Sequence, residues 1–354
     1  YPGSTVGSAA NEALGWEEQK QLNAGFDISI LKNKLSLSAD YFEKKVKGLL
    51  FVPNASLYLG TIPIPVANIG STKTSGIDLT LTYLEKIARK VDLSNTFTFT
   101  TAKNLVTATN EDGTAKYTGG SYFNGQSQTV TVFEKGYTPG YFYGYKTQGL
   151  FQNAKEIAGA PKQTGAQPGD IRFADINGDG VIDAKDQTKI GDPFPAFTMG
   201  WNLNVSYKGI DLNVFTYASV GNDIYRAYER NANYSNKYRS VLARWTGEGS
   251  TNDARNPRYS FVDNNSNIRV SDRYVEDGSF VKIKNIQLGY AIPSHLIQKY
   301  FSGIRVYAQV KNAYTFTKYS GYDPEIAGGI LDTGVDRGAY PQARTYAVGL
   351  DIKL

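Results

Sequence analysis

Apolar and polar side chains alternate along many segments of this 354-residue chain, and the connections between these segments are alternately short and long. A period of two residues is typical of a β-strand with one apolar face and one polar face. The pattern predicts about eleven strands of roughly 9 to 13 residues, a length that suits a tilted membrane-crossing strand better than a soluble one. The expected strands are residues 21–30, 35–42, 77–83, 91–99, 128–133, 141–150, 199–207, 210–214, 280–290, 304–315 and 345–354.

The rhythm of the connections favours an all-β fold, a transmembrane antiparallel β-barrel in an outer membrane. Such barrels have brief periplasmic turns and long extracellular loops. Within residues 77–83, the odd-numbered side chains are expected to face lipid, and the even-numbered ones, such as Asp78 and Thr80, the lumen. A soluble β-sandwich, here a calcium-stabilised binding or adhesion module, shows similar alternation and is the alternative. A helical membrane protein is excluded, because no apolar run approaches the roughly 18 to 20 residues of a spanning helix.

The parity of the strands bears on closure of the barrel. With an odd number of antiparallel strands, the first and last run in the same direction and cannot pair to close an all-antiparallel ring. We therefore expect residues 1–354 to be the C-terminal part of a larger barrel, whose earlier strands supply the partner edges.

Residues 175–186 form an acidic segment with oxygen-bearing side chains at alternate positions around a glycine. The spacing follows the D-x-[DN]-x-[DN]-G pattern of a calcium loop, with Asp rather than Glu at position twelve. The sequence thus predicts a structural Ca²⁺ within a long extracellular loop. The alternative is an Asx-rich turn that is held by its own side-chain to backbone hydrogen bonds. The expected calcium ligands are Asp175, Asn177, Asp179, Val181 through its carbonyl, Asp183 and Asp186.

Composition argues against catalysis and nucleic-acid binding. The chain has no Cys, so disulfides, thiolate metal sites and Cys nucleophiles are excluded, and its single His, His295, lies in a short expected turn. No nucleophile-elbow, zinc-protease or Walker pattern occurs. Asp323 and Glu325 are both carboxylic acids, as in a glycosidase pair, but the sequence does not give the distance between them. The favoured interpretation is that they are solvated acids of a loop. The net charge is +5 and the 38 basic residues are scattered along the chain, which argues against nucleic-acid binding.

An ordered set of motifs resembles the C-terminal half of SusC/RagA-type TonB-dependent transporters. The resemblance implies the last eleven strands of a 22-stranded plugged barrel, in the outer membrane of a Gram-negative bacterium. The family's plug and the segment that contacts the TonB-type energy-coupling protein have no counterpart in this sequence. The motifs are residues 16–27, 67–70 with 75–78, 140–146, 173–225, 275–280 with 288–290, and 321–325.

The resemblance also implies a function and partners. It implies active import of a nutrient, together with a SusD-like surface lipoprotein that presents it, and the remaining barrel strands, the plug and membrane lipid as neighbours. Glycan and peptide importers share the barrel pattern, so both substrate classes stay open. Aromatic side chains of the long loop at residues 221–277 could stack on sugars or grip peptides, or could serve loop packing. These candidates are Tyr225, Tyr228, Tyr234, Tyr238 and Trp245.

Overall fold

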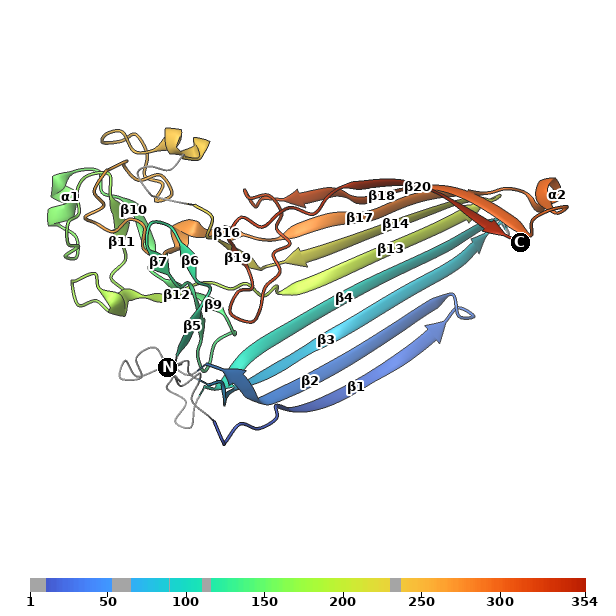
Figure 1. Cartoon of the computed structure of the whole chain (residues 1–354), viewed down its shortest axis with the longest axis horizontal. Helices are drawn as coiled ribbons and strands as arrows, with labels where there is room; N and C mark the ends of the chain where they lie inside the picture. The colour runs from blue at the N-terminus through green and yellow to red at the C-terminus, as the bar shows by residue number, and fades with distance from the viewer. Residues whose placement is uncertain (1–10, 53–64, 89, 110–115, 230–236) are drawn as a thin grey trace, which may run out of the picture.

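The computed structural model describes residues 11–52, 65–88, 90–109, 116–229 and 237–354, and its main feature is one large antiparallel sheet (Figure 1). Nine strands lie side by side in the order of the chain. None of the described helices is long and apolar enough to cross a membrane. The nine strands are β1 (Glu18–Ile30), β2 (Leu35–Phe51), β3 (Ala67–Ile87), β4 (Val91–Ala108), β13 (Phe197–Tyr207), β14 (Ile210–Val220), β17 (Phe280–Ala291), β18 (Gly303–Thr317) and β20 (Thr345–Lys353).

Short turns join the strands at one end of the sheet, the end that carries α2 (Ser294–Ile297) and the C-terminus in Figure 1. Lys208 and Gly209 alone connect β13 to β14, and both have positive φ, 48° and 86°. A two-residue turn of this kind matches the twist of the flanking strands, and glycine adopts it without steric cost. The expected alternation of short and long connections is therefore present.

Two of the expected strands are not part of the main sheet. Residues 128–133 and 141–150 contain only short strands that belong to small sheets at the loop end, among them β8 (Thr131–Phe133), β9 (Tyr141–Gly144) and β10 (Thr147–Leu150). Every side chain of β8 is buried, so this segment packs on both faces and does not alternate between lipid and water. The expectation of about eleven sheet strands is corrected to nine in the described part of the chain.

Residues 46–72, which lie between two of the strands expected from the sequence, are partly strand. The long strand β2 continues to Phe51, β3 begins at Ala67, and these two residues pair with each other. Residues 53–64 lie outside the described part of the chain. The strands on this side therefore reach well beyond the length needed to cross a bilayer core.

The sheet does not close on itself in this chain. β1 and β20 lie at its two edges. Because the sheet has nine strands, an odd number, and each pairs antiparallel with its neighbour, these two strands run in the same direction. Edge strands present a row of backbone groups that require partners, above all in hydrocarbon. An open all-antiparallel sheet with parallel outer strands confirms the parity argument.

One face of the sheet carries apolar side chains in register from strand to strand. Ile28 lies opposite Leu37, Leu37 opposite Leu81, Leu81 opposite Phe97, and Phe97 opposite Trp201. All but Leu37 are exposed, although a soluble sheet would cover such a row with a second layer. This is the face that a barrel turns toward lipid.

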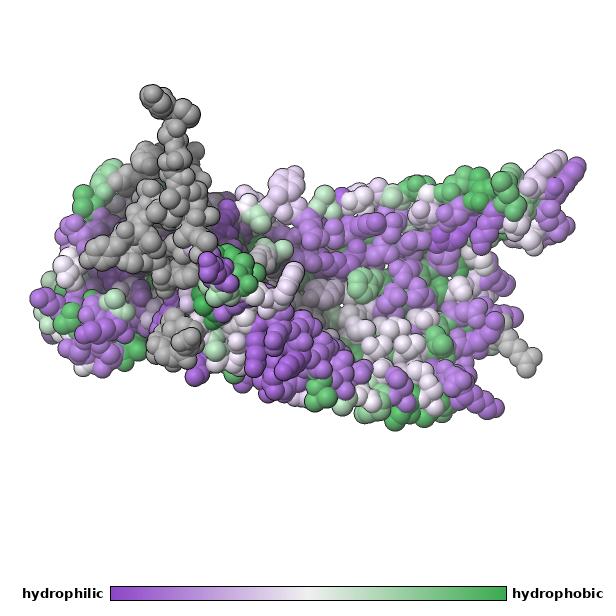
Figure 2. Space-filling model, turned by 60° about the horizontal axis from the view of Figure 1, so that its bottom comes forward, coloured by the Kyte–Doolittle hydropathy of each residue, from purple (hydrophilic) through white to green (hydrophobic). Residues whose placement is uncertain are grey.

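The other face carries polar side chains, and its residues bond to one another across strands. Asn213 donates from Nδ2 to Oδ1 of Asn202 at 2.8 Å and to Oδ1 of Asn204 at 2.7 Å. Asn285 in turn donates to Asn213 at 2.7 Å, and Gln309 donates to Asn285 at 2.8 Å. Hydrophilic residues cover much of the sheet in the view of Figure 2, with hydrophobic residues along its margins. This ladder of amides marks the lumenal face.

The buried hydrophobic core lies at one end of the sheet, in the loops and in the strand ends that adjoin them. We call this part of the structure the loop domain. Its largest clusters are centred on Tyr225, on Phe173 and on Phe133. The remaining elements of the loop domain are β5 (Tyr117–Gly119), β6 (Tyr122–Phe123), β7 (Ser127–Gln128), α1 (Ala154–Ala158), β11 (Ile171–Phe173), η2 (Ala184–Asp186), β12 (Thr188–Gly191), β15 (Asp223–Arg226), η3 (Arg239–Ala243), η4 (Asp272–Tyr274), β16 (Val275–Asp277) and β19 (Val335–Asp336).

Candidate ligand pocket in the loop domain

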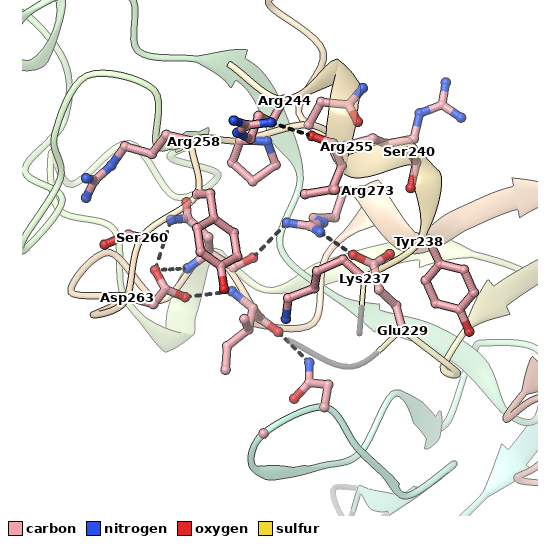
Figure 3. Close-up of a pocket in the computed structure, with 18 of the residues that line it drawn as sticks. Glu229, Lys237, Tyr238, Ser240, Arg244, Arg255, Arg258, Ser260, Asp263 and Arg273 are labelled. Atoms are coloured by element: carbon pink, nitrogen blue, oxygen red, sulfur yellow. Dashed lines mark hydrogen bonds and ion pairs between the residues drawn. The ribbon is translucent and has the colours of Figure 1, made fainter. Parts of the chain in front are cut away.

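Loop segments that are distant in sequence enclose a pocket of about 270 Å³ in the loop domain (Figure 3). The 3-10 helix η3 and the segment at residues 255–263 supply its walls, and residues just before and within η4 complete it. The lining contains five basic and two acidic side chains, which leaves an excess of positive charge. The charged lining residues are Lys237, Arg244, Arg255, Arg258, Arg273, Glu229 and Asp263.

Arg273 is the most buried charged residue of the pocket, with 5% of its surface exposed. Its guanidinium donates to Oε1 of Glu229 at 3.1 Å and lies 4.4 Å from the ring centre of Tyr274. A buried cation needs such partners, because desolvation alone would be costly. Figure 3 shows Arg273 between Glu229 and a backbone carbonyl, which belongs to Asn267.

Asp263 fixes the shape of the loop on the opposite side. Its carboxylate accepts hydrogen bonds from the backbone and side-chain nitrogens of Asn267, both at 2.9 Å, and from the backbone nitrogen of Ile268 at 3.1 Å. Arg258 is held in turn by the fully buried Asp170, at 2.7 Å from Nε to Oδ1. Both of these acids are therefore engaged in building the wall of the pocket.

The rim of the pocket is aromatic and basic. Tyr238, Tyr259 and Phe261 line it and are exposed by 48%, 42% and 78%. Arg244 donates to the carbonyl of Val241 at 3.4 Å and forms no ion pair with the described residues. Exposed rings beside arginines on a concave surface are typical of a ligand-binding site.

Of the four aromatic candidates that the structure describes, only Tyr238 lines this pocket. Tyr228 packs edge to face against Tyr238, with ring centres 5.6 Å apart. Trp245 packs against the cluster around Phe173 and donates to Gln152 at 3.3 Å, so it serves loop packing. Tyr234 lies outside the described residues.

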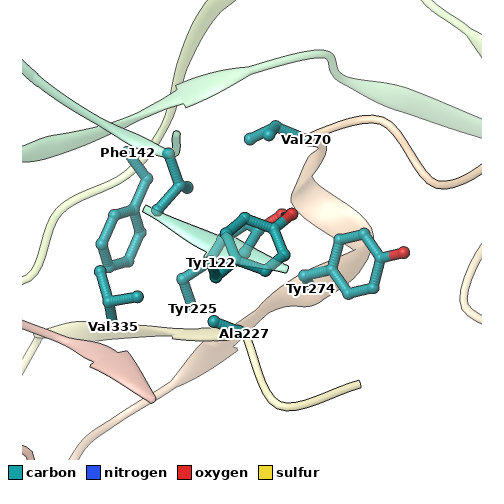
Figure 4. Close-up of a cluster of buried hydrophobic side chains, with 8 residues drawn as sticks. Tyr122, Phe142, Tyr225, Ala227, Val270, Tyr274 and Val335 are labelled. Atoms are coloured by element: carbon teal, nitrogen blue, oxygen red, sulfur yellow. Dashed lines mark hydrogen bonds between the residues drawn. The ribbon is translucent and has the colours of Figure 1, made fainter. Parts of the chain in front are cut away.

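Tyr225 is corrected from a ligand-facing residue to a core residue, because its side chain has no exposed surface. In Figure 4 it crosses Tyr122 and lies beside Tyr274, with Phe142 and Val335 on its other side. Its hydroxyl bonds to that of Tyr122 at 2.7 Å, and burial raises the pKa of Tyr225 well above its ordinary value. This aromatic cluster joins segments that are far apart in the sequence.

Tyr259, Phe261 and the arginines of the pocket are not among the site residues expected from the sequence. The usable signal was the density of Arg and aromatic residues between residues 238 and 274. What could not be found was which of these side chains converge, because the contacts that bring them together span distant loop segments.

The acidic segment at residues 175–186 forms a compact turn. Asp175 accepts backbone hydrogen bonds from Gly178 at 2.7 Å and Gly180 at 2.8 Å. The backbone nitrogen of Val181 donates to Asp179 at 3.0 Å, and Asn177 donates to Asp179 at 2.9 Å. These are the bonds of an Asx-rich turn.

Asp186 closes the same turn from within, with its carboxylate fully buried. It accepts from the backbone nitrogens of Ile176 at 2.9 Å and Asp183 at 2.8 Å. Burial alone would raise the pKa of Asp186, but the amides of Asp183, Ile176 and Asn177 outweigh it and hold the pKa below its ordinary value.

The expected Ca²⁺ stays a prediction. The described residues contain no preformed group of three or more His, Cys, Asp or Glu side chains that could hold a metal. The oxygen atoms of the turn nevertheless suit Ca²⁺. A carboxylate has about four lone-pair sites, and a hydrogen bond from a backbone N–H occupies only one of them. Asp175 and Asp179 therefore keep acceptor capacity beyond the turn.

Asp323 and Glu325 are not the solvated loop acids expected from the sequence. Lys282, on the lumenal face of β17 and almost fully buried, donates to Asp323 at 3.1 Å and to Glu325 at 2.9 Å. Lys284 also bonds Glu325. Burial would raise the pKa of Glu325, but the hydrogen bonds from Lys284 and Lys282 outweigh the effect of burial and lower the pKa. The general acid of a glycosidase has the opposite shift, a raised pKa.

His295, the single histidine of the sequence, lies in α2, at the opposite end of the molecule (Figure 1).

Comparison with known proteins places this geometry in context. Residues 1–215 match the family described as TonB dependent receptor-like, beta-barrel. TonB-dependent receptor P3 of Formosa agariphila is 32% identical over 97% of this chain and 35% of its own length. TonB-dependent receptor SusC of Bacteroides thetaiotaomicron is 26% identical over 100% of this chain and 33% of its own length.

Solved structures show the same fold. The structure of the RagAB peptide transporter matches 98% of this chain and 36% of its own chain, with a TM-score of 0.78 at 24% identity. The RagAB peptide importer in its open-open state matches with a TM-score of 0.76. The chain thus spans about a third of the length of the relatives it matches.

Proposed function

Because the chain belongs to the TonB-dependent receptor-like β-barrel family, we propose that it forms part of the wall and outer mouth of a barrel that actively imports an oligomeric nutrient. The family makes it part of an outer-membrane protein, and the apolar face of the main sheet, whose side chains are largely exposed among the described residues, agrees with this location. The observation that carries the proposal is the open sheet of nine strands, apolar on one face and polar on the other, with a folded loop domain at one end.

The proposed substrate is an oligosaccharide or an oligopeptide, taken up at the loop end. There the pocket lined by η3 and residues 255–263 opens among exposed rings and arginines. Such groups bind polar oligomers by stacking and by charge-assisted hydrogen bonds. A SusD-like surface lipoprotein would cover this mouth and present the oligomer, and the similarity to TonB-dependent receptor SusC and to the RagAB peptide transporter supports this partnership.

Energy for transport would come from a TonB-type coupling protein that acts on a plug inside the completed barrel. The described residues offer no metal cluster, and the sequence has no Walker pattern, so we assign no energy source to this chain. We assign it no catalytic role either. Its acids at the barrel mouth are tied to Lys282 and Lys284.

A deletion in the full-length protein tests the proposed role of the loop domain. Shortening the rim segment at residues 255–263 should impair uptake of the oligomer or capture of the lipoprotein. The barrel should still assemble, because no residue of this segment is in the main sheet. A control deletion in α2, at the other end of the molecule, should leave both unchanged. Normal uptake and normal lipoprotein capture in the loop variant would refute the assignment.

We further propose that Ca²⁺ binds the turn at residues 175–186 and stiffens it. The turn already orients its carboxylates by backbone bonds, so an ion would add ligation without refolding the segment. Its docking against Lys162, whose backbone nitrogen donates to the carbonyl of Gly180 at 2.8 Å, would transmit that stiffness to the loop domain.

A further inference from the structure

The pocket has an unusual floor. Among the described residues, four buried side-chain atoms have no hydrogen-bond partner, and two of them belong to residues that line this pocket. They are Oδ1 of Asn124, a residue with no exposed surface, and Nε of Arg273, a residue with 5% exposed. A buried polar atom without a partner is costly, so such atoms point to a ligand or an ordered water.

The charges of the pocket are not balanced from within. Glu229 is bonded to Arg273 and pairs with Arg226 at 3.4 Å. Asp263 is taken up by backbone and amide nitrogens. Of the lining acids, therefore, neither faces Arg244 or Arg255 in an ion pair. The excess positive charge in a concave site favours an anion.

Among the described residues, Arg255 forms an ion pair with Asp253 alone, at 3.5 Å, and both side chains are about half exposed. Such an exposed pair contributes little and is readily exchanged. Arginine offers a planar fork of donors that matches a carboxylate or a sulfate. Arg244 and Arg255 are therefore the side chains best placed to bind an incoming anionic group.

The aromatic side chains of the rim favour a ligand that also has an apolar surface. Tyr238, Tyr259 and Phe261 present exposed ring surface beside these arginines. A sugar ring has a rigid face of C–H groups that packs on an aromatic ring, whereas the acidic side chain of a peptide is flexible and lacks such a face. At about 270 Å³ the pocket is near the small end of ligand sites, so it takes part of an oligomer and not the whole.

We infer that the pocket binds an acidic sugar residue, one that carries a carboxylate or a sulfate, of an oligosaccharide reaching the outer mouth. The anionic group lies against Arg244 and Arg255, with Arg273 and Asn124 at the floor, and the sugar ring lies against the aromatic rim. This inference rests on the proposed import function and names its substrate class.

Calorimetry on the purified full-length protein tests the inference without any need for transport. The probes are oligogalacturonate, a sulfated galactan oligosaccharide, an uncharged cello-oligosaccharide of equal length and oligoglutamate. We expect one of the two acidic sugars to bind at least tenfold more tightly than the uncharged one, with an affinity that falls as salt rises. The sugar that binds identifies the anionic group.

The double variant Arg244→Gln, Arg255→Gln should weaken that binding at least tenfold. Lys155→Gln removes one positive charge from α1, outside the pocket, and should leave it unchanged. Equal binding of charged and uncharged sugars, or no binding of either acidic sugar, overturns the inference, and tighter binding of oligoglutamate assigns the pocket to acidic peptides instead. If the acidic sugar binds but is not taken up, the import proposal fails and this inference stands.

Discussion

Lys282 of β17 donates from Nζ to both carboxylate oxygens of Asp323, at 3.1 Å each, although the two residues are 41 positions apart. The lysine is 1% exposed and is also bonded to Glu325. The loop that follows β18 is thereby tied to the lumenal wall of the sheet.

Lys282→Met should release this loop. It leaves Asp323 without its cation, and breaking a buried ion pair from one side typically costs about 3 to 5 kcal/mol. We expect faster trypsin cleavage within residues 318–344 of the folded protein. Lys284→Met is the matched control and should have a smaller effect, because Lys284 is more exposed and bonds Glu325 only. Unchanged protection in the Lys282 variant would show that the tie does not hold the loop.

The two faces of β13 should respond differently to charge. Leu203→Arg places a cation on the lipid-facing side and should cost roughly 2 to 4 kcal/mol near the bilayer midplane. Asn204→Arg places it on the lumenal amide ladder and should cost much less. Folding of the full-length protein into lipid vesicles, followed by gel mobility, measures the difference. Equal losses for the two variants would reject the assigned facing.

These two predictions differ in how far the sequence alone could lead to them. Facing depends on alternation, which is local, so the two faces of a strand such as β13 follow from the order of apolar and polar residues along it. The tie between Lys282 and Asp323 depends on how a long loop folds back, and no local pattern records it. Nine of the expected strands are present in the main sheet because alternation along a strand is a local pattern.

The loop domain was mispredicted because contacts between distant segments leave no local pattern in the sequence. Tyr225 resembled an exposed loop aromatic, yet it packs against Tyr122, 103 positions away. Residues 128–133 and 141–150 have strand-like composition, but the strands β8 and β9 within them are buried on both faces. Long-range packing overrides the local pattern where the connections fold into a domain of their own.

Acid should loosen the turn at residues 175–186. The pKa of Asp186 is lowered in the folded turn, so its stabilising effect is fully present above the ordinary value of 3.8 and is lost as pH falls through the folded value. Protection of the amides of Ile176 and Asp183 against hydrogen exchange, relative to their intrinsic exchange rate at each pH, should therefore fall below about pH 4. In Asp186→Asn the exchange should be faster throughout and nearly independent of this titration. A wild-type turn that keeps full protection well below pH 3 or loosens above pH 5 would contradict this origin.

Calcium should bind the same turn. Asp175→Ala together with Asp179→Ala removes two carboxylates and should abolish Ca²⁺ binding by calorimetry and expose the turn to proteolysis. The barrel should stay folded, since neither residue is in the main sheet. Asp253→Ala, an exposed acid outside the turn, is the control. If the wild-type protein binds no Ca²⁺ at millimolar concentration, the turn is held by its own hydrogen bonds alone.

Energy-dependent uptake tests the central claim most directly. Cells that carry the full-length protein and its surface lipoprotein are given a labelled oligomer that binds the purified protein, and accumulation is compared with and without the TonB-type coupling protein. The account predicts that surface binding persists and accumulation is lost when the coupling protein is absent. Accumulation that continues unchanged without the coupling protein would contradict the assignment of this chain to an active importer.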